Sequence, residues 1–217
     1  MKIEILITIL LCLMSYLYGS IPFALVIGKL FFNKDIRNYG SGNLGGTNAT
    51  RVLGNKVGFL VIILDATKCI VSILITRYVC HLIPTLSPDI QYLSAACCVI
   101  GHCYPIFAGF RGGKAVSTSV GYLLITNIYD GIIGILIFIS IVKKTKYVSL
   151  GSISVALLME LFSFFYFLPS PFNILGYSPI GIIANTFIVF ILVYKHKPNI
   201  ERLKNGTESE IHWFDKK

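Results

Sequence analysis

EILITILLCLMSYLYGSIPFALVIG, residues 4–28, is a continuous apolar run in which Glu4 is the single charged residue. A helix needs about 20 mostly apolar residues to cross the hydrocarbon core of a bilayer, so this run predicts a membrane-spanning helix. Lys2 followed by an apolar run is also typical of a signal peptide. However, no small-residue cleavage site precedes a polar mature region, so we expect the run to be retained. Gly19, Ser20 and Pro22 predict a kink or a close helix contact within it.

The composition extends this interpretation to the whole chain of 217 residues, which is 55% hydrophobic and 13% charged. Its mean hydropathy is +0.76. Soluble domains carry about a quarter charged residues, so the chain is expected to be one integral membrane domain, residues 1–217. The formal charge of +9 could suggest nucleic acid. We expect no such partner, because the cations are confined to short loops between apolar runs.

Seven apolar runs predict an all-α, polytopic membrane helix bundle. The predicted spans are residues 4–28, 57–76, 91–108, 115–127, 131–142, 147–167 and 177–194. The fourth and fifth are short, which favours tilted or partly inserted helices and leaves five spans as the alternative count.

Alternate connecting segments hold 16 of the 19 basic residues. These are Lys29, Lys34, Arg37, Arg51 and Lys56, then Arg111 and Lys114, then Lys143, Lys144 and Lys146, and in the tail Lys195, Lys197, Arg202, Lys204, Lys216 and Lys217. The positive-inside rule then predicts an N-terminus outside and a C-terminus in the cytoplasm. All the polar motifs described below would therefore share the cytoplasmic face.

The six cysteines form no C-x-x-C pair, and most lie within apolar runs, so they are interpreted as small buried hydrophobic residues. Cys98, His102 and Cys103 lie close enough in sequence to ligate a metal, but we expect no metal site.

DIRNYGSGNLGGTNATRVLG, residues 35–54, is a polar, glycine-rich segment between the first two spans. Its five glycines would lose much backbone freedom on ordering, but glycine also lets main-chain N–H groups approach a ligand closely. The side chains beside them are the neutral Ser41, Asn43, Thr47 and Asn48 and the cationic Arg37 and Arg51. This chemistry suits an anionic oxygen cluster, and we expect a phosphate, held at a membrane surface.

GHCYPIFAGFRGGKAVSTSVG, residues 101–121, places Gly112, Gly113 and Lys114 directly before an apolar helix. The free N–H groups at a helix N-terminus, together with a lysine, make an anion site. An ordinary turn between helices is the alternative. The segment is not a Walker A loop, because Ala108 and Ala115 stand where a glycine and the Mg-binding hydroxyl are needed.

YKHKPNIERLKNGTESEI, residues 194–211, is the third polar motif. His196 and Asn199 would share one face if the segment is helical, although Pro198 favours a turn. We expect Glu208 to pair with a loop cation and hold the tail in place. The alternative is a juxtamembrane basic segment that fixes topology and touches anionic lipid.

Charged residues within the predicted spans are few. Asp65 and Lys68 lie three residues apart, and a lone charge at mid-bilayer costs about 2.5–3.5 kcal/mol, so mutual pairing in a structural role is expected, with a direct catalytic role as the alternative. Glu160 has no basic neighbour one turn away.

The three motifs, in this order, resemble the bacterial acyl-phosphate:glycerol-3-phosphate acyltransferase family. The matching strings are GSIPF, GSGNLGGTNATRVLG, GHCYPIFAGFRGGKAVST, KYVSLGS and YKHKPNIERLKNGTE, which are spread over nearly the whole chain. The resemblance implies transfer of a fatty acyl group from acyl phosphate to the sn-1 hydroxyl of glycerol 3-phosphate. It implies a multi-pass enzyme of the bacterial inner membrane with a cytoplasmic active site. Acyl phosphate, glycerol 3-phosphate and membrane lipid would be its partners, with no cofactor.

The same resemblance implies roles for particular residues. The implied catalytic residues are Ser41, Arg51, Lys114, His196 and Asn199. The implied substrate- and phosphate-binding residues are Gly40, Gly42, Asn43, Thr47, Asn48, Gly112, Gly113, Ser149 and Ser152, and Glu208 is implied to be structural. Two departures, Gly46 and Ala115, exchange one small residue for another and leave the pattern intact.

No catalytic triad is recognisable, and the chemistry does not demand one. Acyl phosphate is a mixed anhydride with a good leaving group, so positioning and electrostatics could carry most of the rate. Two proton acceptors stay open: His196, and the phosphate of glycerol 3-phosphate itself. We expect Ser41 to donate a hydrogen bond rather than to be acylated.

A transporter of a phosphorylated or anionic solute is the rival function. It predicts polar groups along a path across the bilayer and often an internal repeat. In this sequence the polar groups are instead predicted to lie together on the cytoplasmic face.

Overall fold

The computed structural model describes residues 2–165 and 178–213. Over these residues the chain forms helices and turns, with no β-strand. The α-helices are α1 (Lys2–Gly19), α2 (Phe23–Phe32), α3 (Gly46–Leu53), α4 (Asn55–Leu82), α5 (Ile90–Cys103), α6 (Val116–Thr126), α7 (Ile128–Thr145), α8 (Val148–Phe165), α9 (Pro179–Lys195) and α10 (Lys197–Lys204). Two short 3₁₀ helices, η1 (Ile36–Asn38) and η2 (Ile106–Ala108), lie within the polar connections.

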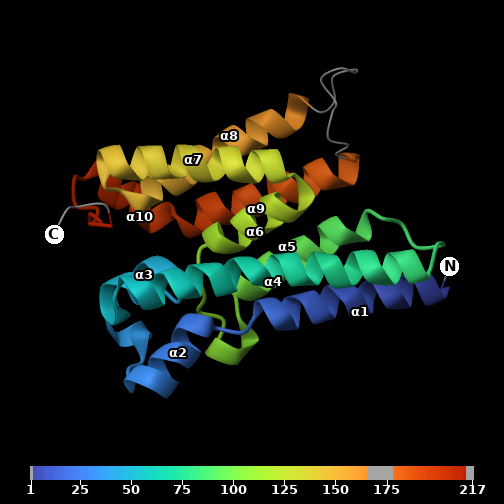
Figure 1. Cartoon of the computed structure of the whole chain (residues 1–217), viewed down its shortest axis with the longest axis horizontal. Helices are drawn as coiled ribbons and strands as arrows, with labels where there is room; N and C mark the ends of the chain where they lie inside the picture. The colour runs from blue at the N-terminus through green and yellow to red at the C-terminus, as the bar shows by residue number, and fades with distance from the viewer. Residues whose placement is uncertain (1, 166–177, 214–217) are drawn as a thin grey trace.

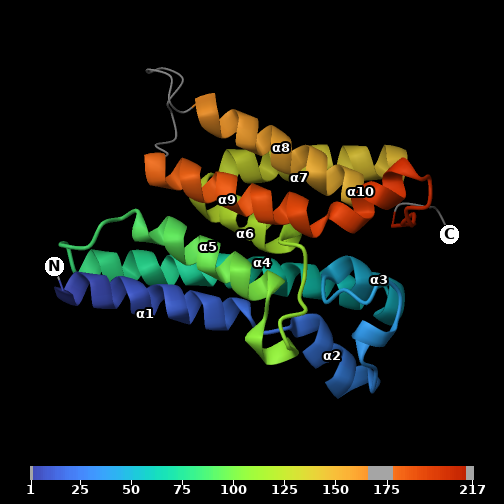
Figure 2. The ribbon, with the colours of Figure 1, turned by 180° about the vertical axis from the view of Figure 1, so that it is seen from behind.

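The long helices run roughly side by side and alternate in direction (Figure 1). The short helices α3 and α10 and the end of the described chain gather at one end of this bundle, and the N-terminus lies at the other (Figure 2). The first and third polar motifs, far apart in sequence, therefore lie at the same end of the bundle.

Helices occupy all seven predicted ranges within the described residues. Residues 166–167 of the sixth predicted span and residue 177 of the seventh lie outside the described residues, as do Lys216 and Lys217. By length and hydropathy, three helical stretches of the described chain could cross a membrane, namely Lys2–Phe32, Asn55–Leu82 and Ile90–Ala108. A fourth is added if α9 and α10, which meet at a bend of 53°, form one span.

The predicted kink is confirmed in the first span, and two predicted boundaries are wrong for identifiable reasons. The first span is divided into α1 and α2 at Ser20–Pro22, as the predicted kink residues suggest. The third ends as an α-helix at Cys103, because the residue before Pro105 disfavours helical backbone. The fifth is longer than predicted, since the Asn127 side chain accepts hydrogen bonds from the N–H groups of Tyr129 and Asp130 and caps α7.

Small residues allow α1 and α5 to pack closely. A Cβ added to Gly19 would stand 2.2 Å from the carbonyl oxygen of Cys98, and one added to Gly101 would stand 2.2 Å from that of Tyr16. Membrane helices associate through such contacts, because lipid tails leave little hydrophobic drive between helices.

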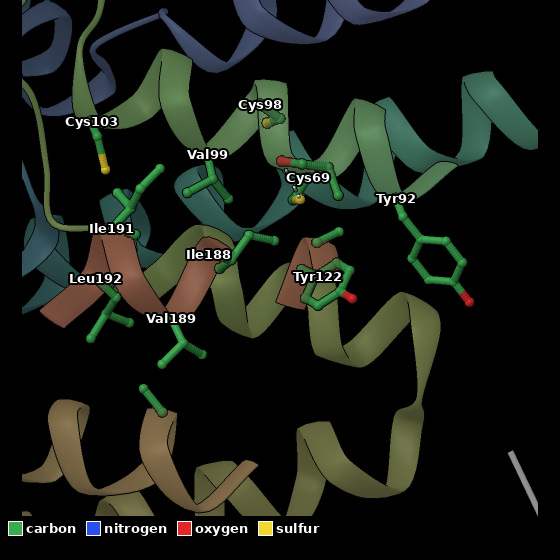
Figure 3. Close-up of a cluster of buried hydrophobic side chains, with 14 of the residues drawn as sticks. Cys69, Tyr92, Cys98, Val99, Cys103, Tyr122, Ile188, Val189, Ile191 and Leu192 are labelled. Atoms are coloured by element: carbon green, nitrogen blue, oxygen red, sulfur yellow. Dashed lines mark hydrogen bonds between the residues drawn. The ribbon is translucent and has the colours of Figure 1, made fainter. Parts of the chain in front are cut away.

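A hydrophobic cluster connects α4 and α5 with α6 and α9 (Figure 3). Cys69 of α4, Val99 of α5, Tyr122 of α6 and Ile188 of α9 are all at most 1% exposed. Cys98 and Cys103 lie in the same cluster, so the interpretation as buried hydrophobic residues is confirmed for these two and for Cys69, whereas Cys12, Cys80 and Cys97 are only partly buried.

Asp65 and Lys68 form the predicted ion pair. The two side chains are 1–2% exposed, and Lys68 Nζ lies 2.7 Å from Asp65 Oδ1. Lys68 also donates to the carbonyl of Ile21, at the break between α1 and α2. Nδ1 of His102 lies 3.6 Å from Asp65 Oδ1, so the pair also reaches the end of α5.

Asp65→Asn is expected to lower stability by about 3–5 kcal/mol, because it leaves the Lys68 ammonium buried without its carboxylate. Thermal unfolding in detergent measures the change. The double variant Asp65→Asn/Lys68→Met is expected to be more stable than the single one, since it removes the unpaired charge. A single variant that melts like the parent would contradict a structural role for the pair.

Candidate active site

The glycine-rich loop is organised around one buried amide, that of Asn48, which is 2% exposed. Its Oδ1 accepts from the N–H of Ser41 at 2.9 Å, and its Nδ2 donates to the carbonyls of Ile36, Tyr39 and Asn43 at 3.0–3.2 Å. The Asn48 amide is therefore occupied by the loop's own backbone. Its observed contacts hold the loop rather than leave a free group for phosphate.

Positive φ angles explain two of the loop's glycines. Gly40 has φ +58° and Gly42 has φ +67°, a region that side-chain-bearing residues rarely adopt. A Cβ on Gly40 would also stand 2.3 Å from Asn48 Oδ1. The turn at Ser41 therefore needs glycine on both sides.

Arg37 does not serve the site as expected. Its guanidinium binds Asp35, with Nη2 2.6 Å from Oδ2, and Lys29 Nζ lies 3.6 Å from the same oxygen. The hydrogen bonds from Arg37 hold the pKa of the Asp35 carboxyl well below its usual range. Asp35 thus caps η1 and occupies the Arg37 guanidinium, and Arg51, on α3, is the cation of this motif that faces the cavity described below.

The Gly112–Gly113 turn is held from two sides. The N–H of Gly113 donates to the carbonyl of His102 at 3.0 Å, and Nδ2 of Asn43 donates to the carbonyl of Gly112 at 3.1 Å. A Cβ added to Gly113 would stand 1.9 Å from His102 Nε2, so only glycine fits over that ring. The first and second motifs are thereby locked together, and Lys114 leads directly into α6.

A chain of polar contacts joins the second motif to the third. Lys114 Nζ donates to Asn199 Oδ1 at 2.6 Å, and Asn199 Nδ2 donates to Glu208 Oε1 at 2.6 Å. Ser149 Oγ donates to the same oxygen at 2.7 Å, while Arg202 Nε donates to Glu208 Oε2 at 2.7 Å. Glu208 thus pairs with a cation, but the expected loop cation is wrong: the partner is Arg202 of α10.

His196 lies at the bend between α9 and α10 and is 3% exposed. Its Nδ1 lies 2.8 Å from the carbonyl oxygen of Leu192. Because a carbonyl only accepts, Nδ1 carries the hydrogen and Nε2 keeps a lone pair. Burial lowers the pKa of His196 to about 4, so the ring is neutral at pH 7.

One cavity of about 1260 Å³ collects these groups. Its polar lining includes Ser41, Asn43, Thr47, Arg51, Lys114, Ser149, His196, Asn199, Arg202 and Glu208. Its apolar lining comes from α4, α6, α7 and α8 and includes Ile62, Ile63, Ile70, Leu123, Leu124, Ile135, Phe138 and Val155. From Phe59 to Ile70 the α4 wall covers twelve residues, about 16 Å at the rise of a helix. The cavity therefore combines a cationic, hydrogen-bonding region with a long apolar wall.

The structure brings most of the implied site residues to this cavity. Gly40, Gly42, Asn48, Gly112 and Ser152 also line it. Gly113 does not: it lies over His102 and lines a separate small void with Asp65 and Lys68. The hydroxyl of Ser152 donates to the carbonyl of Val148 at 2.8 Å.

Sequence reasoning assigned no site role to several residues of the cavity lining, among them His102, Arg202 and Trp213. The first two lie inside the quoted motifs, where their histidine and arginine chemistry could have marked them. Trp213 lies beyond the last motif, and no sequence signal pointed to it.

Burial of the ammonium, with Arg202 and Arg51 nearby, lowers the pKa of Lys114 to about 8. If protonated Lys114 binds an anionic substrate, kcat/KM should fall as pH rises through about 8. Lys114→Arg should move this falling limb to higher pH, because a guanidinium keeps its proton. The measurement is a profile of kcat/KM from about pH 6 to 10. Lys56→Arg, outside the cavity, serves as the control, and an unmoved limb in Lys114→Arg would assign the titration to another group.

Comparison with known proteins identifies the family. The family model described as glycerol-3-phosphate acyltransferase matches residues 9–206. A glycerol-3-phosphate acyltransferase of Listeria welshimeri is 42% identical over 208 residues, covering 95% of this chain and 98% of the relative. Glycerol-3-phosphate acyltransferase 2 of Bacillus anthracis is 37% identical, covering 94% and 98%.

A solved structure has the same fold. The crystal structure of PlsY, an integral membrane glycerol 3-phosphate acyltransferase, in its glycerol 3-phosphate form superposes with a TM-score of 0.83 at 34% identity. The match covers 94% of this chain and 96% of PlsY. The lysophosphatidic acid form of PlsY gives a TM-score of 0.80 at 32% identity. By sequence and by fold, this chain belongs to the glycerol-3-phosphate acyltransferase family.

Proposed function

We propose that the protein transfers a fatty acyl group from acyl phosphate to the sn-1 hydroxyl of glycerol 3-phosphate, giving lysophosphatidic acid and inorganic phosphate. This would be the first step of phospholipid synthesis. The observation that carries the proposal is the single cavity that joins Arg51, Lys114 and Asn199 to a long apolar wall. Both substrates carry a phosphate, which matches the cationic lining. One of them also carries a fatty chain, which matches the apolar lining.

The proposed step is a direct transfer. The sn-1 oxygen attacks the acyl carbonyl carbon, the bond from that carbon to the phosphate oxygen breaks, and inorganic phosphate leaves. Arg51 and Lys114 neutralise the phosphate groups, and the charge that builds on the leaving phosphate is stabilised most in the transition state. Ser41 acts as a hydrogen-bond donor and is not acylated.

Two groups can accept the proton of the attacking hydroxyl. His196 lines the cavity, and its Nε2 carries the lone pair, so it could act as base. The phosphate of glycerol 3-phosphate is the other acceptor. His196→Gln distinguishes them, since glutamine provides hydrogen bonds but no base at neutral pH.

The proposal places the whole chain, residues 1–217, in the bacterial inner membrane as one domain with seven spans: α1 with α2, and α4, α5, α6, α7, α8 and α9. The N-terminus would face outside, and the active site and C-terminus would face the cytoplasm. The alternating helix directions support this arrangement, as does the position of α3, α10 and the α7–α8 connection, which carry basic residues, at one end of the bundle (Figure 1). Access of membrane-impermeant reagents to a cysteine placed at Lys204 tests it.

A donor comparison tests the function. Purified protein in detergent or liposomes is given glycerol 3-phosphate with acyl phosphate, acyl-CoA or acyl carrier protein. We expect lysophosphatidic acid and released phosphate with acyl phosphate alone, without added metal. Faster product formation from acyl-CoA or acyl carrier protein would overturn the proposed donor. Binding of glycerol 3-phosphate with no acyl transfer from any donor would overturn the function and favour the transporter.

A further inference from the structure

Residues 207–213, here called the C-terminal segment, cross the end of the bundle after α10. On one side they are fixed to the α7–α8 connection: the N–H of Ile211 donates to the carbonyl of Lys146 at 2.9 Å, and the Ile211 side chain is 8% exposed. Glu208 adds its contacts to Ser149 and Arg202. The family match ends at residue 206, just before this segment.

On the other side the segment contacts α3 and α4. Nη2 of Arg51 donates to the carbonyl of Ser209 at 3.2 Å. Nε1 of Trp213 donates to Thr50 Oγ1 at 3.4 Å, and the Trp213 ring lies 5.2 Å from that of Phe59, centroid to centroid. The segment therefore connects the two sides of the cavity, which it lines with Glu208, Ser209 and Trp213.

These contacts act on the residue that precedes Arg51. Thr50 accepts from Trp213 and donates to the carbonyl of Thr47 at 2.8 Å, so its hydroxyl ties the indole to the first turn of α3. Thr50 also packs on Gly58 of α4, where an added Cβ would stand 2.1 Å from its Cγ2. The carbonyl of Ser209 orients the guanidinium without neutralising it, because a carbonyl carries no net charge.

We propose that Trp213 is a positioning residue for Arg51 in the acyl transfer. Through Thr50 and the backbone of Ser209, the C-terminal segment holds the Arg51 guanidinium toward the phosphate-binding region of the cavity. This inference rests on the proposed function and adds a residue that acts through another.

Kinetics of two variants test the proposal. Trp213→Ala is expected to lower kcat/KM for glycerol 3-phosphate about tenfold, since both the hydrogen bond and the aromatic contact are lost. Trp213→Phe keeps a ring against Phe59 but lacks the indole N–H, so a loss of about threefold is expected. Glu210→Gln, an exposed residue of the same segment, is the matched control. Parental kinetics in Trp213→Ala would overturn the proposal.

A double-variant cycle separates positioning from general stability. In an Arg51→Lys background the guanidinium is absent, so Trp213→Ala should cost little further activity. A merely structural role predicts the same tenfold loss in both backgrounds, and that result would overturn the proposal. Thermal melting of all variants shows whether each remains folded.

Trp213 is the single tryptophan of the chain, so its fluorescence gives a second readout. Titration of the parent protein with glycerol 3-phosphate should change the emission saturably, because the indole lines the cavity. An unchanged emission at saturating concentration would contradict the proposal. Failure of the proposed function looks different: the parent protein itself would then form no lysophosphatidic acid from acyl phosphate.

Discussion

Arg51→Ala is expected to lower kcat/KM by about 10²–10³ in folded protein, the range seen when a group that stabilises developing charge is removed. Arg51 is the cation that α3 presents to the cavity, and its guanidinium can donate two parallel hydrogen bonds to a phosphate. Alanine removes both the positive charge and the paired N–H donors of the guanidinium. The measurement is release of phosphate and formation of lysophosphatidic acid at several concentrations of each substrate.

Two matched variants complete this experiment. Arg51→Lys keeps the charge but not the bidentate geometry, so it should retain part of the activity. Lys56→Ala removes a cation from the N-terminal turn of α4, outside the cavity, and should leave the rate close to the parent. Near-parental turnover in Arg51→Ala would remove this residue from the proposed site.

Asn199→Ala is expected to have an effect of similar size, about 10²–10³ on kcat/KM. Its amide connects Lys114 to Glu208, with both contacts at 2.6 Å, and the residue is 6% exposed. Without it, the Lys114 ammonium loses the acceptor that fixes it, and one oxygen of Glu208 loses a donor. Steady-state kinetics measure the loss, and thermal melting shows whether the protein is still folded.

Asn205→Ala provides the control, because Asn205 is exposed at the end of α10, on the same helix-turn unit. It should be neutral. If Asn199→Ala were active and Asn205→Ala were not, the contacts from Asn199 to Lys114 and Glu208 would be irrelevant to catalysis.

The helices themselves could be predicted from the sequence. A membrane helix satisfies its own backbone hydrogen bonds, so a run of apolar residues is enough to indicate it. The pairing of Asp65 with Lys68 followed from the same reasoning, since a buried charge needs a partner and the i, i+3 spacing provides one. The glycine and polar residues between the apolar runs likewise located the three polar motifs. The distribution of basic residues predicted that these motifs lie on the same face of the membrane.

The individual roles within those motifs could not be predicted, because they depend on contacts between distant segments. Arg37 and Arg51 are both cations of the first polar motif, yet one binds Asp35 and the other faces the cavity. The side-chain amide of Asn48 could bind a ligand by its chemistry, but it is hydrogen-bonded to the loop backbone. Hydrogen-bond competition of this kind has no signature in residue type or spacing.

By itself, therefore, the sequence determined the helical membrane architecture, the chemistry available at its polar end and the family to which that chemistry is similar. Helix formation and hydropathy are local properties, and the resemblance to the family depends on short motifs that follow one another in a fixed order. Only the tertiary structure decided that Lys114 meets Asn199, that His102 lies beneath Gly113 and that Trp213 contacts Thr50. Those contacts join residues separated by up to 163 positions, and packing of the whole bundle is what brings them within hydrogen-bonding distance.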